Sequence, residues 1–108
     1  MKLITSIAGL AQNSKAWLVD IWGVMHNGVA PFPDAVDACQ TFRRQGGMVI
    51  LVSNAPRPHG AVAAQLDKIG VAQSAYDAII SSGDICRVLI SALGPTPIFH
   101  LGPERDRP

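Results

Sequence analysis

Asp20 is the residue of this chain best suited to chemistry, because it closes an apolar run that begins at Trp17 and breaks at Gly23. Burying an unpaired carboxylate inside a sheet is very costly. Such an acid fits better at the C-terminal tip of a buried strand, where the crevice of an open α/β sheet binds ligands. We therefore predict that Asp20 is a reactive carboxylate and that the rest of the chain positions it.

Two further polar pairs follow apolar runs in the same way. Ser53-Asn54 follows the run 48–52, and Ser81-Ser82 follows the run 78–80. In a parallel sheet these strand ends share one edge, and the helices that follow direct free N–H groups toward it. The sequence thus predicts an anion site at this edge, with phosphate as the commonest ligand.

A carboxylate next to a bound phosphate would repel it unless the chemistry requires both. A Mg²⁺ ion, which prefers oxygen ligands, could bridge the two groups. Asp20 could also attack phosphorus itself and form an aspartyl-phosphate. The two roles are compatible, with Ser53 and nearby backbone N–H groups binding the phosphoryl oxygens.

Apolar periodicity and turn signals predict the elements that position these residues. Asn27-Gly28 is the pair favoured in a type I′ turn, so residues 24–29 are predicted to form a hairpin beside Asp20. Alternating helices and strands predict an α/β fold: a three-layer, Rossmann-like parallel sheet with helices on both faces and strands buried on both sides. The predicted helices are 3–12, 33–45, 59–69 and 82–93, and the predicted strands are 16–20, 48–52, 78–81 and 97–101.

Composition excludes several classes of protein. Hydrophobic residues make up 48% of the chain, charged residues 16%, and the net charge is +1. The scattered Lys and Arg side chains predict no nucleic-acid partner and no membrane binding. Cys39 and Cys86 fit neither a disulfide framework nor a metal motif, so we expect reduced, packed thiols. Without a bilayer-length apolar stretch, and with only a faint N-terminal likeness to a signal peptide, the predicted location is cytoplasmic.

Two stretches resemble motifs of the haloacid dehalogenase-like (HAD) hydrolase superfamily. Residues 18–24 are similar to its first motif, and residues 49–54 to its second, in which Ser or Thr ends the second strand. The order of elements matches from Trp17 to Leu101. The Asn27-Gly28 turn and the Ser53-Asn54 pair favour class IIA, which includes N-acetylglucosamine-phosphate and p-nitrophenyl phosphatase-like proteins.

The resemblance implies a role for each residue of the site. Asp20 corresponds to the catalytic nucleophile and a Mg²⁺ ligand, and Trp22 to the position whose backbone carbonyl binds the metal. Ser53 corresponds to the catalytic-motif residue that hydrogen-bonds the phosphoryl group, and Asn54 would help to hold the substrate. The implied activity is Mg²⁺-dependent hydrolysis of a small phosphorylated metabolite through an aspartyl-phosphate.

The chain departs from the family pattern in two ways. Phosphatases of the superfamily carry a second Asp two residues after the first, as general acid and base, whereas this chain has Trp22, which cannot protonate a leaving alkoxide. His26 is the nearest alternative proton donor. The family's later Lys and acidic pair are also missing, so we expect residues 1–108 to be the N-terminal part of a HAD-like core domain, truncated, without the cap domain and inactive by itself.

Several alternatives stay open at this point. The chain could be a non-catalytic phosphate-binding or regulatory HAD-like protein, or a small Mg²⁺-binding receiver-like module. Asp20 could be a turn or capping aspartate, and Ser53-Asn54 a plain turn. Ser82 and Asp84 are expected to cap a helix. A free sheet edge could pair with a second copy of the chain and form a homo-oligomer.

Overall fold

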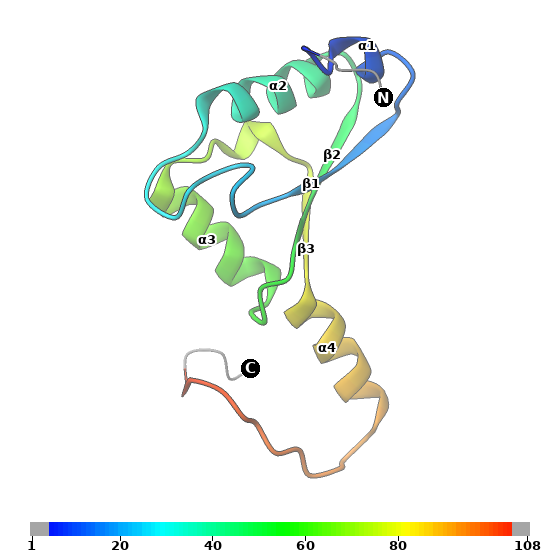
Figure 1. Cartoon of the computed structure of the whole chain (residues 1–108). Coiled ribbons are helices and arrows are strands. Elements are labelled where there is room, and N and C mark those ends of the chain that lie inside the picture. The colour runs from blue at the N-terminus through cyan, green and yellow to red at the C-terminus, as the bar shows by residue number, and fades with distance from the viewer. Residues whose placement is uncertain (1–4, 105–108) are drawn as a thin grey trace.

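A computed structural model describes residues 5–104 of the chain, and it has the predicted α/β order. The first half contains α1 (Ala8–Ala11), β1 (Ala16–Asp20), α2 (Pro33–Arg44) and β2 (Met48–Ser53). The second half contains α3 (His59–Ile69), the 3₁₀ turn η1 (Gln73–Ala75), β3 (Ala78–Ser81) and α4 (Ser82–Ala92). Figure 1 shows the three strands crossing the body of the molecule, with α4 running away from it.

The three strands form one parallel sheet in the order β1-β2-β3. Asp20 pairs with Val52 in β2, and Ser53 pairs with Ser81 in β3. Parallel pairing therefore brings the three polar strand ends to one edge, as the sequence predicts. The Rossmann-like α/β class is confirmed.

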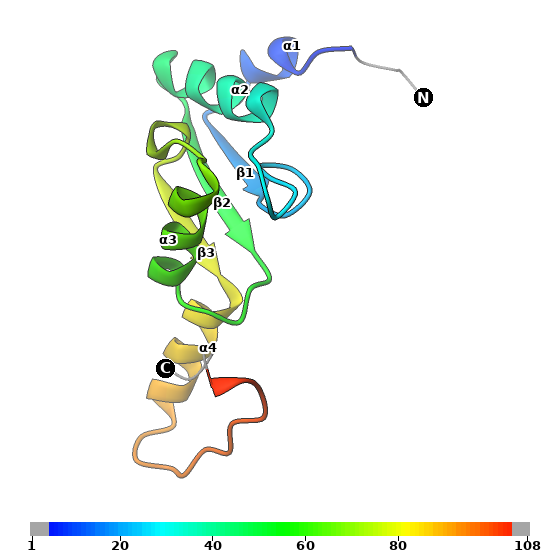
Figure 2. The same ribbon diagram turned by 90° about the vertical axis from the view of Figure 1, so that its left-hand side faces the viewer.

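Helices α2 and α3 lie against one face of this sheet (Figures 1 and 2). Val49, Leu51 and Leu66 are completely buried there. Trp17 of β1 stacks on Phe42 of α2, with ring centroids 4.1 Å apart and planes 4° apart. Gly47 permits this packing, because a Cβ atom there would lie 2.4 Å from the Phe42 ring. These contacts fix β1, and therefore Asp20, relative to the helical layer.

Asp77, for which the sequence predicted no role, connects helix α2 to the sheet. Asp77 accepts a hydrogen bond from the Val49 backbone N–H at 2.8 Å and one from Arg43 of α2 at 2.6 Å. The Arg43 hydrogen bond is the main reason that the pKa of Asp77 lies below its ordinary value. Asp77 thus joins α2 to β2 just before β3 begins.

The prediction that the strands are buried on both sides is wrong for the opposite face of the sheet. Leu18 is 73% exposed, and Met48, Val52 and Ile80 are also exposed. These side chains alternate with the buried ones, so they project from the other face. Within residues 5–104 no helix packs over this face, which is the physical reason for their exposure. The prediction of two packed thiols is correct for Cys39, which is buried, and wrong for Cys86 on α4, which is exposed.

Three predicted local structures differ from the observed ones. The N-terminal helix covers only Ala8–Ala11, and residues 1–4 of its predicted range lie outside the described residues. No type I′ turn forms, because Asn27 has negative φ: its side-chain Oδ1 instead accepts the N–H groups of Val29 and Ala30. Residues 97–101 form no strand, since this segment folds back near α4 and does not reach a sheet edge (Figure 1).

Candidate functional site

An open groove of about 670 Å³ lies at the C-terminal ends of β1 and β2. It contains the four residues to which the family resemblance gives a role, together with two apolar side chains of the sheet. Its lining residues are Leu18, Asp20, Trp22, Val52, Ser53 and Asn54. The β1–β2 pairing explains this gathering, because Asp20 lies beside Val52, one residue before Ser53.

The Asp20 carboxylate is exposed and incompletely hydrogen-bonded. Its Oδ1 accepts the backbone N–H of Ile21 at 2.8 Å. No described residue donates to Oδ2. One oxygen is therefore oriented by the backbone, while the other remains available to a ligand in the groove.

Trp22 projects outward beside this carboxylate and is 68% exposed. Gly23, with φ of +81°, turns the chain immediately after it. Within the described part of the chain no N–H donates to the Trp22 carbonyl. That oxygen is therefore free to bind a cation, as the predicted role requires.

Mg²⁺ binds proteins through one or two carboxylates while keeping several waters and sharing substrate phosphate oxygens. Asp20 and the Trp22 carbonyl supply two oxygen donors of that kind. Elsewhere in residues 5–104, no three His, Cys, Asp or Glu side chains gather as a metal site. The residues fit Mg²⁺ as a partly hydrated ion shared with a phosphoryl group.

Ser53 is oriented by the turn that follows β2. Its Oγ accepts the backbone N–H of Ala55 at 3.1 Å. A hydroxyl also has one proton to donate, and no acceptor for it exists among the described residues. The Ser53 hydroxyl can therefore donate to an anion in the groove.

His26, the candidate proton donor, does not line the groove. It is only 2% exposed, and its Nδ1 accepts the backbone N–H of Gly28 at 2.8 Å. Nδ1 must therefore lack a proton, and the ring serves to hold the loop after β1. The structure does not support the expected proton-donor role, because the His26 ring is buried and hydrogen-bonded to the loop backbone at Gly28.

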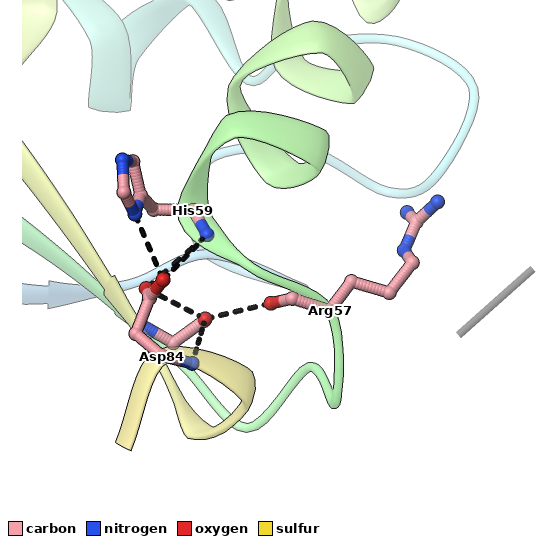
Figure 3. Close-up of polar contacts among 4 residues, drawn as sticks. Arg57, His59 and Asp84 are labelled. Atoms are coloured by element: carbon pink, nitrogen blue, oxygen red, sulfur yellow. Dashed lines mark hydrogen bonds and ion pairs between the residues drawn. The ribbon is translucent and has the colours of Figure 1, made fainter. Parts of the chain in front are cut away.

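Ser81, the last residue of β3, and Asp84 of α4 have structural roles near the same edge of the sheet. Figure 3 shows the polar contacts of Asp84 with its neighbours. Ser81, and not the predicted Ser82, is the N-cap of α4: its Oγ accepts the Asp84 N–H, and the Asp84 carboxylate accepts the Ser81 N–H in return. The pattern of Ser81 followed three residues later by an acid is the signal for this capping box. Asp84 is thereby confirmed as a helix-capping residue.

The charge of Asp84 is strongly stabilised. Hydrogen bonds from His59, first from its backbone N–H and then from its ring, hold the pKa of Asp84 well below its ordinary value of 3.8, and Ser81 adds to the effect. His59 Nδ1 lies 2.8 Å from Asp84 Oδ1. Both Asp84 oxygens therefore already accept hydrogen bonds from protein donors.

A larger hollow of about 730 Å³ lies between α4 and residues 98–103. It contains none of the predicted site residues, and one wall is a segment without regular structure. The strand-end groove is therefore the better candidate, because of the two hollows it is the one that combines a carboxylate, a free carbonyl and a hydroxyl.

Each helix within residues 5–104 falls short of the length and apolarity needed to cross a membrane.

A parallel α/β sheet with a carboxylate at the end of its first strand and a hydroxyl at the end of its second defines a Rossmann-like fold with a strand-end ligand groove. Residues 17–108 match the profile of the haloacid dehalogenase-like hydrolase family. The structure also resembles that of a haloacid dehalogenase-like family hydrolase from Brucella suis 1330, with a TM-score of 0.89 and 45% sequence identity. A comparison with curated proteins gave no match.

The chain therefore belongs to the haloacid dehalogenase-like hydrolase family. The likeness to the Brucella protein covers 97% of this chain and 40% of that one. The chain thus spans less than half the length of the protein that it resembles.

Proposed function

We propose that the groove formed by Asp20, Trp22, Ser53 and Asn54 binds the phosphoryl group of a small phosphorylated metabolite and that Asp20 is its nucleophile. The observation that carries this proposal is the free Oδ2 of a backbone-oriented carboxylate beside a hydroxyl donor. Class IIA phosphatase chemistry is the form of HAD-like activity that the motif resemblance favours. The two free cysteines favour a cytoplasmic location.

The proposed reaction has two steps, transfer of the phosphoryl group to Asp20 and its release to water. Asp20 Oδ2 attacks phosphorus, the bond from phosphorus to the leaving oxygen breaks, and the leaving group departs with the electron pair. Ser53 Oγ donates to a phosphoryl oxygen as negative charge develops, and Asn54 lies where it can contact the substrate. Mg²⁺, held by Asp20 and the Trp22 carbonyl, would neutralise charge between carboxylate and phosphoryl group. Water then releases phosphate from the aspartyl-phosphate.

The groove favours leaving groups that need no proton. Trp22 cannot act as an acid, and His26 is buried outside the groove. An alkoxide leaving group requires protonation, whereas a carboxylate or phenolate departs readily as an anion. We therefore expect acyl and aryl phosphates to phosphorylate Asp20 faster than alkyl phosphates do.

Because neither Trp22 nor His26 can supply a proton in the groove, a second candidate function arises: the protein binds phosphate ligands without turnover. An aspartyl-phosphate also needs a group that activates water for its release. No titratable side chain other than Asp20 lines the groove in residues 5–104. In this second function Asp20 and Ser53 would bind a ligand reversibly.

Covalent capture of a phosphoryl group separates the two candidates. The chain is incubated with acetyl phosphate and Mg²⁺, and its mass is measured before and after peptide mapping. We expect the mass of one phosphoryl group on the peptide that contains Asp20. The adduct should be absent from Asp20→Asn and present in Asp34→Asn, a control acid in the first turn of α2.

An adduct that persists in Asp20→Asn would contradict the assignment of the nucleophile. If inorganic phosphate binds in the groove but no adduct forms with acetyl phosphate, the non-catalytic function is the correct one. If neither binding nor an adduct is found, both candidates fail.

A further inference from the structure

Residues 54–58 connect β2 to α3 and carry the polar end of the groove. Both Asn54 and the Ala55 N–H that orients Ser53 belong to this loop. The chain leaves β2 without regular structure until α3 begins at His59. Its position therefore depends on contacts made by other elements.

Ser81 holds one end of the loop. Its side chain is 1% exposed, and its Oγ lies 2.6 Å from the Arg57 carbonyl and 2.8 Å from Asp84 Oδ2. The single hydroxyl proton can serve only one acceptor at a time, and the Arg57 carbonyl is the nearer. Figure 3 shows the dashed contact that reaches the Arg57 carbonyl of the loop.

Gly83 holds the middle of the loop at close range. Its backbone N–H donates to the Ala55 carbonyl at 3.1 Å. A Cβ atom at Gly83 would lie 2.5 Å from both the Arg57 carbonyl carbon and the Pro56 carbonyl oxygen. Only glycine lets the loop approach α4 this closely, because the opposing atoms belong to the backbone and cannot rotate away.

Asp84 joins the far end of the loop to the same turn. Its Oδ1 accepts the backbone N–H of His59 at 3.0 Å, and its Oδ2 accepts the N–H of Ser81 at 3.1 Å. One carboxylate thus connects the first residue of α3 to the last residue of β3. We call Ser81, Gly83 and Asp84 the loop clamp.

We propose that the loop clamp positions Ser53 and Asn54 for phosphoryl binding, so that its three members are positioning residues of the groove. This inference rests on the proposed function. The connection is short: Gly83 N–H binds the Ala55 carbonyl, and Ala55 N–H binds Ser53 Oγ. The two hydrogen bonds use the two peptides that flank the Ala55 Cα. A displacement of the loop away from Gly83 therefore moves Ala55, and with it the N–H that orients the Ser53 hydroxyl and the adjacent Asn54.

The test compares Gly83→Ala with Gly60→Ala in the whole chain. Gly60, in the first turn of α3, has open space where a Cβ would be placed. Gly83→Ala should move the backbone amide resonances of Ser53 and Asn54 and weaken the binding of inorganic phosphate with Mg²⁺ by about tenfold, the lower end of what a supporting partner contributes. Gly60→Ala should change neither.

Affinity is measured in the folded chain, so a role in stability alone would leave it unchanged. If Gly83→Ala fails to fold, Ser81→Ala carries the test, because it removes the hydroxyl contact to Arg57 without adding an atom. Wild-type affinity and unmoved Ser53 and Asn54 resonances in the folded variant would overturn the proposal.

Failure of the proposed function gives a different result. If the wild-type chain does not bind inorganic phosphate, that function is wrong. The amide resonances of Ser53 and Asn54 in the ligand-free variants then decide whether the loop clamp positions these residues.

Discussion

Asp20 ends β1, and Asp84 lies in the first turn of α4, just after the end of β3, yet the surroundings of these two acids are opposite. Asp84 has both oxygens engaged, by the backbone N–H and ring of His59 and by the backbone N–H of Ser81. Asp20 has one oxygen bound to the next N–H of its own chain and a second oxygen without a protein donor. The first carboxylate is saturated with protein donors, and the second is not.

The difference shows how function can be assigned among similar residues. A carboxylate whose acceptor sites are filled from two elements joins those elements and has little capacity for a ligand. A carboxylate oriented through one oxygen keeps its other oxygen for metal or phosphorus. Asp20 is therefore the chemical centre, whereas Asp84 supports the loop that completes the same groove.

Exchanging each carboxylate for an amide should separate the two roles most strongly. Asp20→Asn should weaken the binding of phosphate with Mg²⁺ by at least about 100-fold, the upper end of what losing a supporting partner costs. Its free energy of unfolding should change by less than about 0.5 kcal/mol, as for other surface substitutions. Isothermal titration calorimetry and urea unfolding measure the two quantities.

In Asp84→Asn the larger change should be in stability, with a smaller loss of affinity. Equal losses of affinity in the two variants would break the distinction between them.

Ser81→Ala should destabilise the chain by about 1–3 kcal/mol, because the Arg57 carbonyl and the Asp84 N–H lose a buried partner. Ser82→Ala is the matched control: Ser82 is exposed and adjacent, and it is not the N-cap. Its effect should stay within about 0.5 kcal/mol. Urea unfolding of the two variants decides this, and a greater loss in Ser82→Ala would mean that the cap has been assigned to the wrong residue.

Acid should destabilise the loop clamp through Asp84. The pKa of this carboxyl is depressed in the folded chain, so its contribution is fully present above its ordinary value of 3.8 and is lost as the pH falls toward the folded pKa. Unfolding midpoints measured between about pH 5 and about pH 2 should fall for the wild-type chain and fall less for Asp84→Asn. Asp77, also depressed in pKa, contributes to the acid loss that remains. Parallel acid profiles for the two chains would contradict the effect of Asp84.

Trp22→Ala should have the smallest effect on metal binding. The proposed Mg²⁺ ligand at this position is the backbone carbonyl, which every residue carries. The affinity for Mg²⁺ should change within about twofold, as expected for an exposed side chain. A large loss, measured by calorimetry, would mean that the indole and not the carbonyl supports the ion.

Much of the fold was predictable because local signals fix the ends of its elements. Gly70 adopts positive φ at the end of α3, and Pro33 begins α2, as their residue types indicate. The parallel pairing then brings Asp20 and Ser53 to one groove, which alternation of helices and strands also predicts.

The remaining features depend on tertiary contacts that the sequence pattern does not specify. An apolar residue such as Leu18 does not reveal which face of its strand another element covers. Ser53 and Ser81 both follow apolar runs, and only the packing of α4 against the loop makes the second one structural. Asn27-Gly28 supports more than one turn, and the side-chain hydrogen bonds of Asn27 select the observed one.

The resonances of Asp20 test the central claim most directly. Mg²⁺ and then beryllofluoride, a mimic of a phosphoryl group on a carboxylate, are titrated into the chain with labelled aspartate side chains. Asp20 should shift first with Mg²⁺ and further with beryllofluoride, followed by the Ser53 amide, while Asp84 stays unmoved. No shift at Asp20 at millimolar Mg²⁺ with beryllofluoride, or a larger shift at Asp84, would contradict the account.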